Sequence, residues 1–412
     1  MEERTNILNV LLKLGAVMLL NGAEVNRVER RLEELGHAYG ASEMSVFVIT
    51  ACMVVTMEFP DGSKLTQTRR ILGAGGTDYR VIERLDRLAV ECCAARPQAA
   101  ELQRRMEECL ALPSDRAGFY AGSVFAAAGF AVFFGGGWLE ALVAGVFALL
   151  VAFMQRRWGN VAPNLIIFNL VCSLAVGLII CAVSWALPDL RVDKVFIGEV
   201  MLLIPGIAMT NAIRDMLMGD TIAGVMRFVE TLLWAAGLAC GFMAALLLTG
   251  VSAAVGPGLP SDMGGMVLQT AMAFVGSLGF AMIFHLRRSW LAVASLGGML
   301  SWVVYLGVSV GAGVEGIFLP TLVASAFAAL YAELCARAVK APSLLFVIPA
   351  VVPLIPGAAL YYTMSFAVVA DWATCGTYGL RTLWFALGIA AGMCITWAIE
   401  ATWRRSRLLR VG

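Results

Sequence analysis

The chain has 412 residues, of which 60% are hydrophobic and 14% are charged, and its formal net charge is +1. Because a soluble domain carries about 25% charged residues, this composition excludes a wholly soluble protein. The near-zero net charge gives no reason to expect a nucleic-acid partner. With only two histidines, His37 and His285, a histidine-based metal site is not expected.

The charged residues are concentrated in the N-terminal part of the chain. Residues 1–112 hold 14 of the 30 Lys and Arg residues and 16 of the 29 Asp and Glu residues. This shift in composition predicts a separate domain over residues 1–114. Glu2, Glu3 and Lys13 interrupt the first apolar residues, so the start does not read as a signal peptide and the domain is expected in the cytoplasm.

Within this domain the apolar residues recur first at helical spacing, then alternate, then return to helical spacing. Asp61–Gly62 supplies a hairpin turn between the last two alternating segments, and Pro97 separates the last two helical ones. The prediction is a small α+β domain. Its helices are expected at 4–20, 23–38, 78–95 and 98–111, and its strands at Met44–Ile49, Met53–Phe59 and Lys64–Arg70.

Ten apolar runs follow, and each is near the roughly 20 residues that a helix needs to cross the hydrocarbon core. The fold class predicted for the chain is therefore an α-helical polytopic membrane protein with ten transmembrane helices. The runs are 117–135, 138–154, 164–187, 195–213, 228–249, 266–286, 290–310, 316–335, 343–369 and 383–401.

The distribution of Lys and Arg among the loops predicts the orientation of these helices. If residues 1–114 are cytoplasmic, 13 Lys and Arg residues fall on the cytoplasmic side and three, Arg191, Lys194 and Arg381, fall on the opposite side. Cytoplasmic loops are enriched in these residues. Both termini are therefore expected in the cytoplasm, and the asymmetry requires all ten spans.

The membrane region contains an internal repeat. The run Leu203-Ile-Pro-Gly206 recurs as Leu354-Ile-Pro-Gly357, and at the same offset of 151 residues Asp220 matches Asp371 and Thr231 matches Thr382. The chain then divides into five-helix units at 115–262 and 263–412. Since five is odd, the two units must cross the membrane in opposite senses, which is the inverted repeat common in secondary transporters.

The repeated run places Pro205-Gly206 and Pro356-Gly357 inside the fourth helix of each unit. Proline removes a backbone donor and glycine allows the backbone to unwind, so both helices are expected to be broken. Substrate sites of such transporters lie near the midplane at broken helices. The two Pro-Gly breaks are therefore the first choice for the substrate site, and packing kinks are the alternative.

Polar side chains within the spans are the next candidates, because a charge at the bilayer centre costs about 2.5–3.5 kcal/mol on insertion scales. Glu199 is the candidate proton carrier, with a structural ion pair as the alternative. Arg214 is a candidate to bind a substrate carboxylate. The alternative is that its positive charge only sets the orientation of the helices in the membrane. Asp220 and Asp371 are candidate gate residues or plain loop residues. Asn164, Asn169, Asn211 and Asp215 complete the predicted pathway.

The N-terminal motif Leu20-Asn-Gly-Ala-Glu-Val-Asn-Arg-Val-Glu29, the strand pair with Asp61-Gly62 and Thr68-Arg-Arg70, and the two Leu-Ile-Pro-Gly runs resemble the threonine/serine exporter (ThrE) family. The resemblance covers the whole chain, in a form that fuses two halves found as separate proteins in some bacteria. It implies a bacterial inner-membrane protein that exports threonine and serine in exchange for protons. Within the motif, Gly22, Glu24, Arg27 and Glu29 are the matching positions, with helix-surface charges as the alternative for the charged ones.

We therefore expect a secondary exporter of small polar metabolites that works by alternating access around the two breaks. A succinate-type dicarboxylate exporter is one alternative, and a membrane-anchored hydrolase or regulator acting through residues 1–114 is another. The sequence has no HExxH or ATP-binding motif, so an enzyme is not expected and the driving force is a gradient or a partner. The expected partners are a small amino acid or carboxylate, protons and the lipid bilayer, with no cofactor; self-assembly stays open.

Overall fold

The computed structural model describes residues 2–49, 51–71, 78–111, 115–159, 164–203, 206–251, 262–339 and 341–408. The chain forms two compact units. The first consists of Met1–Asp115 together with Asp220–Met226, and the second of Arg116–Gly219 together with Arg227–Gly412.

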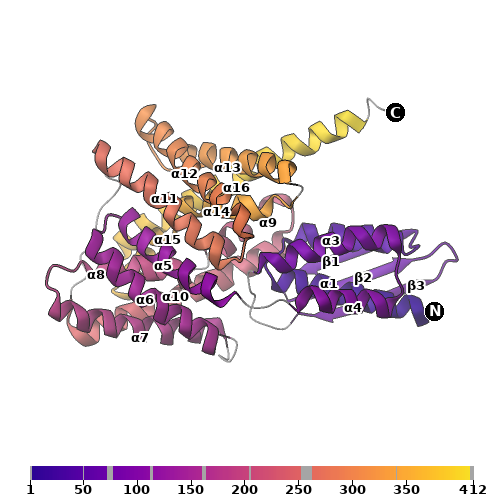
Figure 1. Cartoon of the computed structure of the whole chain (residues 1–412), viewed down its shortest axis with the longest axis horizontal. Coiled ribbons are helices and arrows are strands. Elements are labelled where there is room, and N and C mark those ends of the chain that lie inside the picture. The colour runs from indigo at the N-terminus through magenta and orange to yellow at the C-terminus, as the bar shows by residue number, and fades with distance from the viewer. Residues whose placement is uncertain are drawn as a thin grey trace. The chain divides into compact units, whose positions relative to one another are not determined.

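The first unit contains a three-stranded antiparallel sheet in the order β1-β2-β3 (Figure 1). Glu43 pairs with Glu58 across the first two strands, and Cys52 pairs with Arg70 across the last two. The predicted order of helices and strands in this region is confirmed. The elements are α1 (Glu2–Leu20), α2 (Val25–Ala38), β1 (Glu43–Ile49), β2 (Cys52–Glu58), β3 (Lys64–Arg70), α3 (Tyr79–Ala95) and α4 (Ala99–Leu110).

One face of the sheet forms the core of this unit. Met53, Val55 and Met57 of β2 alternate with less buried residues, as a strand with one covered face requires. The helices α1 and α2 contact the strands, and their apolar faces include the fully buried Leu8 and Leu32.

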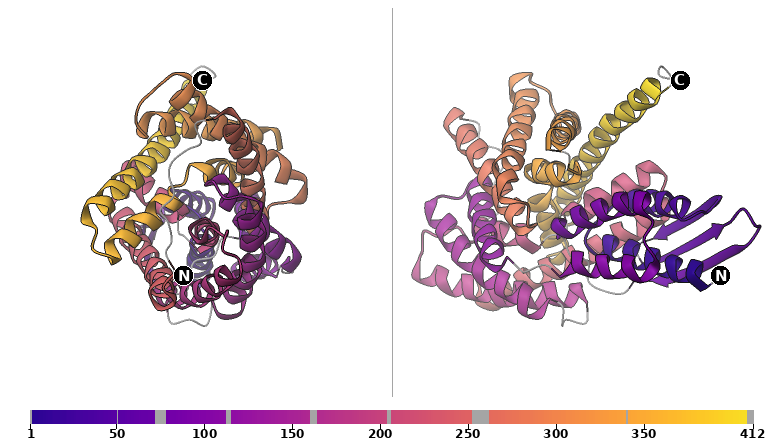
Figure 2. Two further views of the ribbon diagram at one scale, coloured as in Figure 1. Left: turned by 90° about the vertical axis from the view of Figure 1, so that its left-hand side faces the viewer. Right: turned by 45° about the vertical axis from the view of Figure 1, so that its right-hand side comes forward.

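The second unit is helical (Figures 1 and 2). Its elements are α5 (Arg116–Phe133), α6 (Trp138–Trp158), α7 (Leu165–Ala186), α8 (Val192–Leu203), α9 (Gly206–Met218), α10 (Thr221–Thr249), α11 (Met263–Ile283), η1 (Arg288–Trp290), α12 (Leu291–Leu306), η2 (Gly307–Gly311), α13 (Phe318–Val339), α14 (Leu344–Val351), η3 (Val352–Leu354), α15 (Gly357–Val368) and α16 (Trp372–Leu408).

Eight helices in the described part of the chain are long and apolar enough to cross a membrane, and α14–η3 with α15 make a ninth if this pair, bent by 51°, is one span. The remaining predicted span, 195–213, corresponds to α8 and α9 on either side of residues 204–205, which lie outside the described residues. The chain is thus a polytopic membrane protein, and the number ten stays a prediction.

The outer surface of this unit is apolar where lipid would contact it. Leu142, Val146, Leu149 and Phe153 lie on one face of α6 at spacings of three and four residues, and all four are exposed. A row of exposed large apolar side chains is unfavourable in water and favourable in hydrocarbon. This pattern supports a bilayer as the solvent of this surface.

The short helices α8 and α14 are enclosed by protein instead. All eight residues of α14 are buried, and so are all residues of α8 except Leu202. Interrupted helices leave backbone groups without partners, which a membrane tolerates only where protein or water covers them. The enclosure of α8 and α14 explains how the chain can interrupt its helices here.

The two halves of this unit have the same order of elements at the predicted offset. When 151 is added to the bounds of α8, the result is 343–354, and α14–η3 spans Leu344–Leu354. The starts of α9 and α10 shift in the same way to 357 and 372, where α15 and α16 start at Gly357 and Trp372.

The predicted starts of the fifth and tenth spans, 228 and 383, are too late. Arg227, Glu230 and Arg381 interrupt the apolar runs, yet the helices extend N-terminally past them.

The same glycine contact occurs in both halves. Gly241 of α10 lies against Ser173 Oγ and the Leu170 carbonyl of α7, and Gly392 of α16 lies against Ser325 Oγ and the Leu322 carbonyl of α13. Absence of a side chain lets the helices approach closely, as small residues do at membrane helix interfaces. The halves therefore share a packing device as well as an order of elements.

Candidate functional site

A cavity of about 420 Å³ lies within the second unit, beside the second Pro-Gly break. Ile355 and Pro356, which separate η3 from α15, line it together with Ala358 and Ala359 of the first turn of α15. The rest of the wall comes from residues in or next to α5, α8, α11, α12, η2, η3, α15 and α16 and from the segment before α13. These are Phe133, Phe134, Lys194, Ile197, Gln269, Trp302, Tyr305, Ser309, Gly316, Ile317, Pro353, Leu354, Tyr362, Tyr378, Arg381 and Phe385.

The cavity wall carries two cations, Lys194 and Arg381, and no Asp or Glu among the described residues that line it. Lys194 Nζ lies 3.1 Å from Asp193 Oδ2, so its charge is balanced locally. No described carboxylate lies within 4 Å of the Arg381 guanidinium, which sits 5.3 Å from the centroid of the Tyr378 ring. The cavity therefore has an excess positive charge at Arg381.

Aromatic rings form much of the remaining wall. The Phe133 and Trp302 ring centroids are 4.6 Å apart, and Trp302 stacks on Tyr305 at 4.8 Å. Gln269, which is 4% exposed, donates from Nε2 to the Phe133 carbonyl at 3.0 Å, while its Oε1 accepts no hydrogen bond from the described residues. Such a chamber, mostly apolar with few polar groups, is typical of a small-molecule site.

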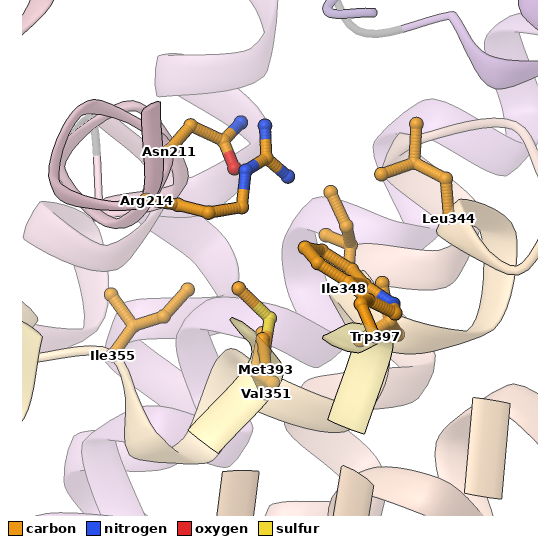
Figure 3. A pocket seen from close by; sticks show the side chains of 9 residues that line it. Asn211, Arg214, Leu344, Ile348, Val351, Ile355, Met393 and Trp397 are labelled. Atoms are coloured by element: carbon orange, nitrogen blue, oxygen red, sulfur yellow. The ribbon is translucent and has the colours of Figure 1, made fainter. Parts of the chain in front are cut away.

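A second, much smaller cavity of about 10 Å³ is also lined by Ile355 (Figure 3). Asn211 and Arg214 project from α9 toward it, and Leu344, Ile348 and Trp397 lie opposite. The Arg214 guanidinium carbon is 5.4 Å from the centroid of the Trp397 ring. The cavity is too small for a metabolite.

Arg214 belongs to a buried ion-pair cluster. Its Nη2 lies 3.1 Å from Asp215 Oδ1, and Arg227 Nη1 of α10 donates to Asp215 Oδ2 at 2.7 Å. Arg214 and Asp215 are each 3% exposed. Arg214 and the partly buried Arg227 thus both contact the carboxylate of Asp215.

The second half has a contact of different chemistry at the equivalent positions. An offset of 151 relates Asp215 to Phe366 and Arg227 to Tyr378, and these two rings stack with centroids 5.8 Å apart and planes at 10°. The first contact joins α9 to the long helix α10, and the second joins α15 to the long helix α16. Tyr378 also lines the large cavity, so the second contact borders the open side.

Glu199 lies inside α8 with 0% of its surface exposed. Neither of its carboxylate oxygens has a hydrogen-bond partner in the part of the chain that the structure describes. The structural ion pair considered as an alternative is therefore not observed. At the equivalent position of the second half stands Ala350, so only one half carries this acid.

The other predicted pathway residues have the following places. Asn164 caps α7 by accepting from Ile167 N at 2.8 Å, and the buried Asn169 donates to the Trp234 carbonyl at 3.4 Å. Asp371 precedes α16, and hydrogen bonds from Thr374 lower the pKa of its carboxyl. Asp220 precedes α10, Gly206 begins α9 and Gly357 begins α15. Pro205 lies outside the described residues.

The predicted motif of the first unit holds its elements together. Gly22 has a φ of 91°, a conformation that favours glycine, and Glu24 occupies the N-cap position of α2. Arg27 lies 3.6 Å from Asp86 of α3, and Arg31 bonds the same carboxylate at 2.7 Å. These charges are therefore not only helix-surface charges.

Glu29 has a further property. Its Oε1 accepts from the backbone N–H of Val48 at 3.0 Å, which joins α2 to β1. Burial, with the negative charges of Asp220 and Glu33 of the same compact unit, raises the pKa of this carboxyl to about 7.

Sequence reasoning missed the cavity residues Arg381 and Gln269. The apolar run of the tenth span begins after Arg381, which predicts a loop position, whereas Arg381 lies within α16. Gln269 is a polar residue within the sixth apolar run, and this position is the sequence signal that marks it.

The helices and the large cavity define this chain as a polytopic membrane protein with a chamber of metabolite size. Two family descriptions match it: "Putative threonine/serine exporter" over residues 9–249 and "Threonine/Serine exporter, ThrE" over residues 269–399. The chain belongs to the ThrE family of exporters, and the predicted resemblance is confirmed.

Two curated relatives span nearly the whole chain. A protein of Mycobacterium tuberculosis named "Probable threonine/serine exporter" is 22% identical over 94% of this chain and 75% of its own length. The "Threonine/serine exporter" of Corynebacterium glutamicum is 22% identical over 96% of this chain and 82% of its own length. No solved structure matches the chain.

Proposed function

We propose that this protein is a secondary transporter that exports threonine and serine across a bacterial inner membrane, in exchange for protons and by alternating access around the two Pro-Gly breaks. The family and the names of the two relatives support the substrate class. The proposed topology has ten spans in two inverted five-helix units, with both termini and the N-terminal domain in the cytoplasm.

The observation that carries this proposal is the position of Ile355. It lines both the cavity of about 420 Å³ and the one of about 10 Å³. A transporter needs a site that opens to one side while the path to the other is closed. A residue at the second break that lines one cavity of metabolite size and one too small for a metabolite supports this arrangement.

The two equivalent contacts are the proposed gates. The ion pair between Asp215 and Arg227 closes the cytoplasmic side in this state, beside Arg214 in the small cavity. The stack of Phe366 on Tyr378 is the equivalent contact beside the large cavity, and it rearranges when that side closes. In the alternate state Arg214 becomes accessible to a substrate carboxylate arriving from the cytoplasm.

Glu199 is the proposed proton carrier. An ionised carboxylate without a partner in the apolar interior would be costly, so the neutral form suits the present state. Loss of the proton would then favour a rearrangement of α8, which also places Lys194 and Ile197 at the cavity. This links the protonation of one acid to the shape of the chamber.

A dicarboxylate such as succinate is the second candidate substrate, favoured by the presence of both Lys194 and Arg381 in one wall. The 3.1 Å contact of Lys194 with Asp193 leaves Arg381 as the single unbalanced cation, which fits one carboxylate better than two.

The test is efflux from vesicles containing the purified full-length protein and preloaded with labelled threonine, serine or succinate. Release of threonine and serine is expected to accelerate when an inward proton gradient is imposed. A release rate that does not depend on the gradient would contradict proton exchange. Release of succinate but not of threonine or serine would show that the substrate is a dicarboxylate.

The Glu199→Gln variant is expected to lose the response to the gradient. Its matched control is Glu315→Gln, which removes an exposed carboxylate outside the helices. Full gradient dependence in Glu199→Gln would exclude this residue as the carrier.

A further inference from the structure

The large cavity contains three features that converge on a carboxylate. Arg381 is a guanidinium without a carboxylate partner among the described residues, and the lining includes no described acid. Ala358 and Ala359 bring the first turn of α15 to the same wall. The N-terminus of a helix attracts anions through its unpaired N–H groups and its dipole, and interrupted membrane helices use it for substrate carboxylates.

The same cavity contains a different feature that favours a cation. Gln269 Oε1 is a buried acceptor with no hydrogen bond from the described residues, although its Nε2 is fixed by the Phe133 carbonyl at 3.0 Å. A buried acceptor without a donor costs free energy, and a ligand that donates to it would remove that cost. The stacked rings of Trp302, Tyr305 and Phe385 line the same wall, and aromatic rings attract ammonium groups.

We propose that this cavity is a binding site for a zwitterionic amino acid, in which Arg381 with the N-terminus of α15 holds the carboxylate and Gln269 Oε1 with the aromatic wall holds the ammonium group. The inference rests on the proposed function for its substrate class and adds the residues that recognise each end of the ligand. It also explains why the cavity carries only one unbalanced charge. A zwitterion needs one cation and one neutral acceptor, while a dicarboxylate needs two cations.

The test is equilibrium binding to the full-length protein in lipid nanodiscs, without any gradient, so that it does not depend on transport. The probes are L-threonine, its methyl ester, which has no carboxylate, 3-hydroxybutyrate, which has no ammonium group, and succinate. L-threonine is expected to bind at least about tenfold more tightly than the others, since a charge-assisted hydrogen bond is lost in each case.

Two variants assign the two ends of the ligand. Arg381→Gln is expected to weaken threonine binding by about tenfold or more and to leave binding of the methyl ester unchanged. Gln269→Leu is expected to weaken threonine and the methyl ester but not 3-hydroxybutyrate. Arg288→Gln removes an exposed arginine outside the cavity wall and is the matched control.

The proposal is overturned if Arg381→Gln binds threonine as the wild type does, or weakens all four probes equally. It is also overturned if the wild type binds no amino acid, or prefers succinate. Vesicle efflux separates these outcomes from a failure of the proposed function. If the wild type exports threonine and Arg381→Gln exports it equally well, the exporter function stands and the proposed binding site is excluded. Thermal unfolding of each variant shows whether lost binding reflects lost folding.

Discussion

Arg227 Nη1 of α10 donates a hydrogen bond of 2.7 Å to Asp215 Oδ2 of α9. The same carboxylate lies 3.1 Å from the buried Arg214, so one acid contacts two guanidinium groups. In the second half the equivalent positions hold Phe366 and Tyr378, which stack. The position of the contact is thus common to both halves, whereas its chemistry is not.

The shared carboxylate predicts unequal costs for the two partners. Asp215→Asn removes the carboxylate that contacts both Arg214 and Arg227 and is expected to lower the free energy of unfolding by about 3 kcal/mol or more. Arg227→Gln is expected to cost less, because Asp215 keeps Arg214. Titration with SDS in mixed micelles measures both, and the double variant should cost clearly less than the sum of the single ones. Equal and additive costs would show that the pair is not coupled.

The sequence was informative about elements whose pattern is local. The strands of the first unit begin and end within one residue of their predicted bounds, because alternation and the Asp61–Gly62 turn are encoded in neighbouring residues. The repeated Leu-Ile-Pro-Gly run is also a local pattern: α9 begins at Gly206 and α15 at Gly357, and proline and glycine disfavour a continuous helix.

The cavity could not be predicted, since its wall combines residues from distant parts of the chain. Phe133, Lys194, Gln269 and Arg381 are brought together only by helix packing. Charged residues inside α10 and α16 also make the predicted starts of these helices too late. The reason is that a hydropathy pattern does not distinguish a charged residue that ends a span from one that faces a cavity.

Glu29 predicts a pH dependence for the first unit. Its pKa of about 7 is above the ordinary 4.5, so the folded state binds this proton more tightly than the unfolded chain does. Stability is therefore greatest below about pH 4.5 and falls as the pH rises through 7. The loss is expected to be about 1–2 kcal/mol, once solvent screening of this half-buried group is allowed for.

Hydrogen exchange of the β1 peptide in the full-length protein measures this effect locally, because Val48 N–H bonds Glu29. After correction for intrinsic rates, exchange should be faster at pH 8 than at pH 5 in the wild type and independent of pH in Glu29→Gln. Glu33→Gln, on the same helix, is the control and should keep most of the dependence. An unchanged pH profile in Glu29→Gln would assign the effect to another group.

Pro356 predicts a defect in transport without a defect in binding. It stands between η3 and α15, where the helix axes bend by 51°. Pro356→Ala allows a continuous helix, so the two states should interconvert more slowly. Threonine efflux is expected to fall about tenfold, which corresponds to about 1.4 kcal/mol on the barrier, while the threonine affinity stays within about twofold.

Pro349→Ala is the matched control for this variant. Pro349 lies within α14, which continues through it as a helix, so its replacement should leave the bend and the efflux rate unchanged. Efflux from Pro356→Ala equal to that of the wild type would mean that the break is a packing feature.

The glycine contacts predict equal effects of substitutions in the two halves. A Cβ at Gly241 would collide with Ser173 Oγ and the Leu170 carbonyl, and one at Gly392 with Ser325 Oγ and the Leu322 carbonyl. Each Gly→Ala variant is expected to lower the free energy of unfolding by about 1–3 kcal/mol, because the backbone carbonyl cannot move aside without shifting a helix.

Gly376 supplies the control within the same long helix as Gly392. A Cβ at Gly376 would have no heavy atom within 4 Å among the described residues, so Gly376→Ala should stabilise α16 by up to about 1 kcal/mol through its higher helix propensity. Unfolding in mixed micelles compares the three variants under one condition. Stabilisation by all three would mean that the helices are not in close contact at Gly241 and Gly392. Opposite signs for Gly241 and Gly392 would show that the two halves pack differently there, which would weaken the case for two equivalent units.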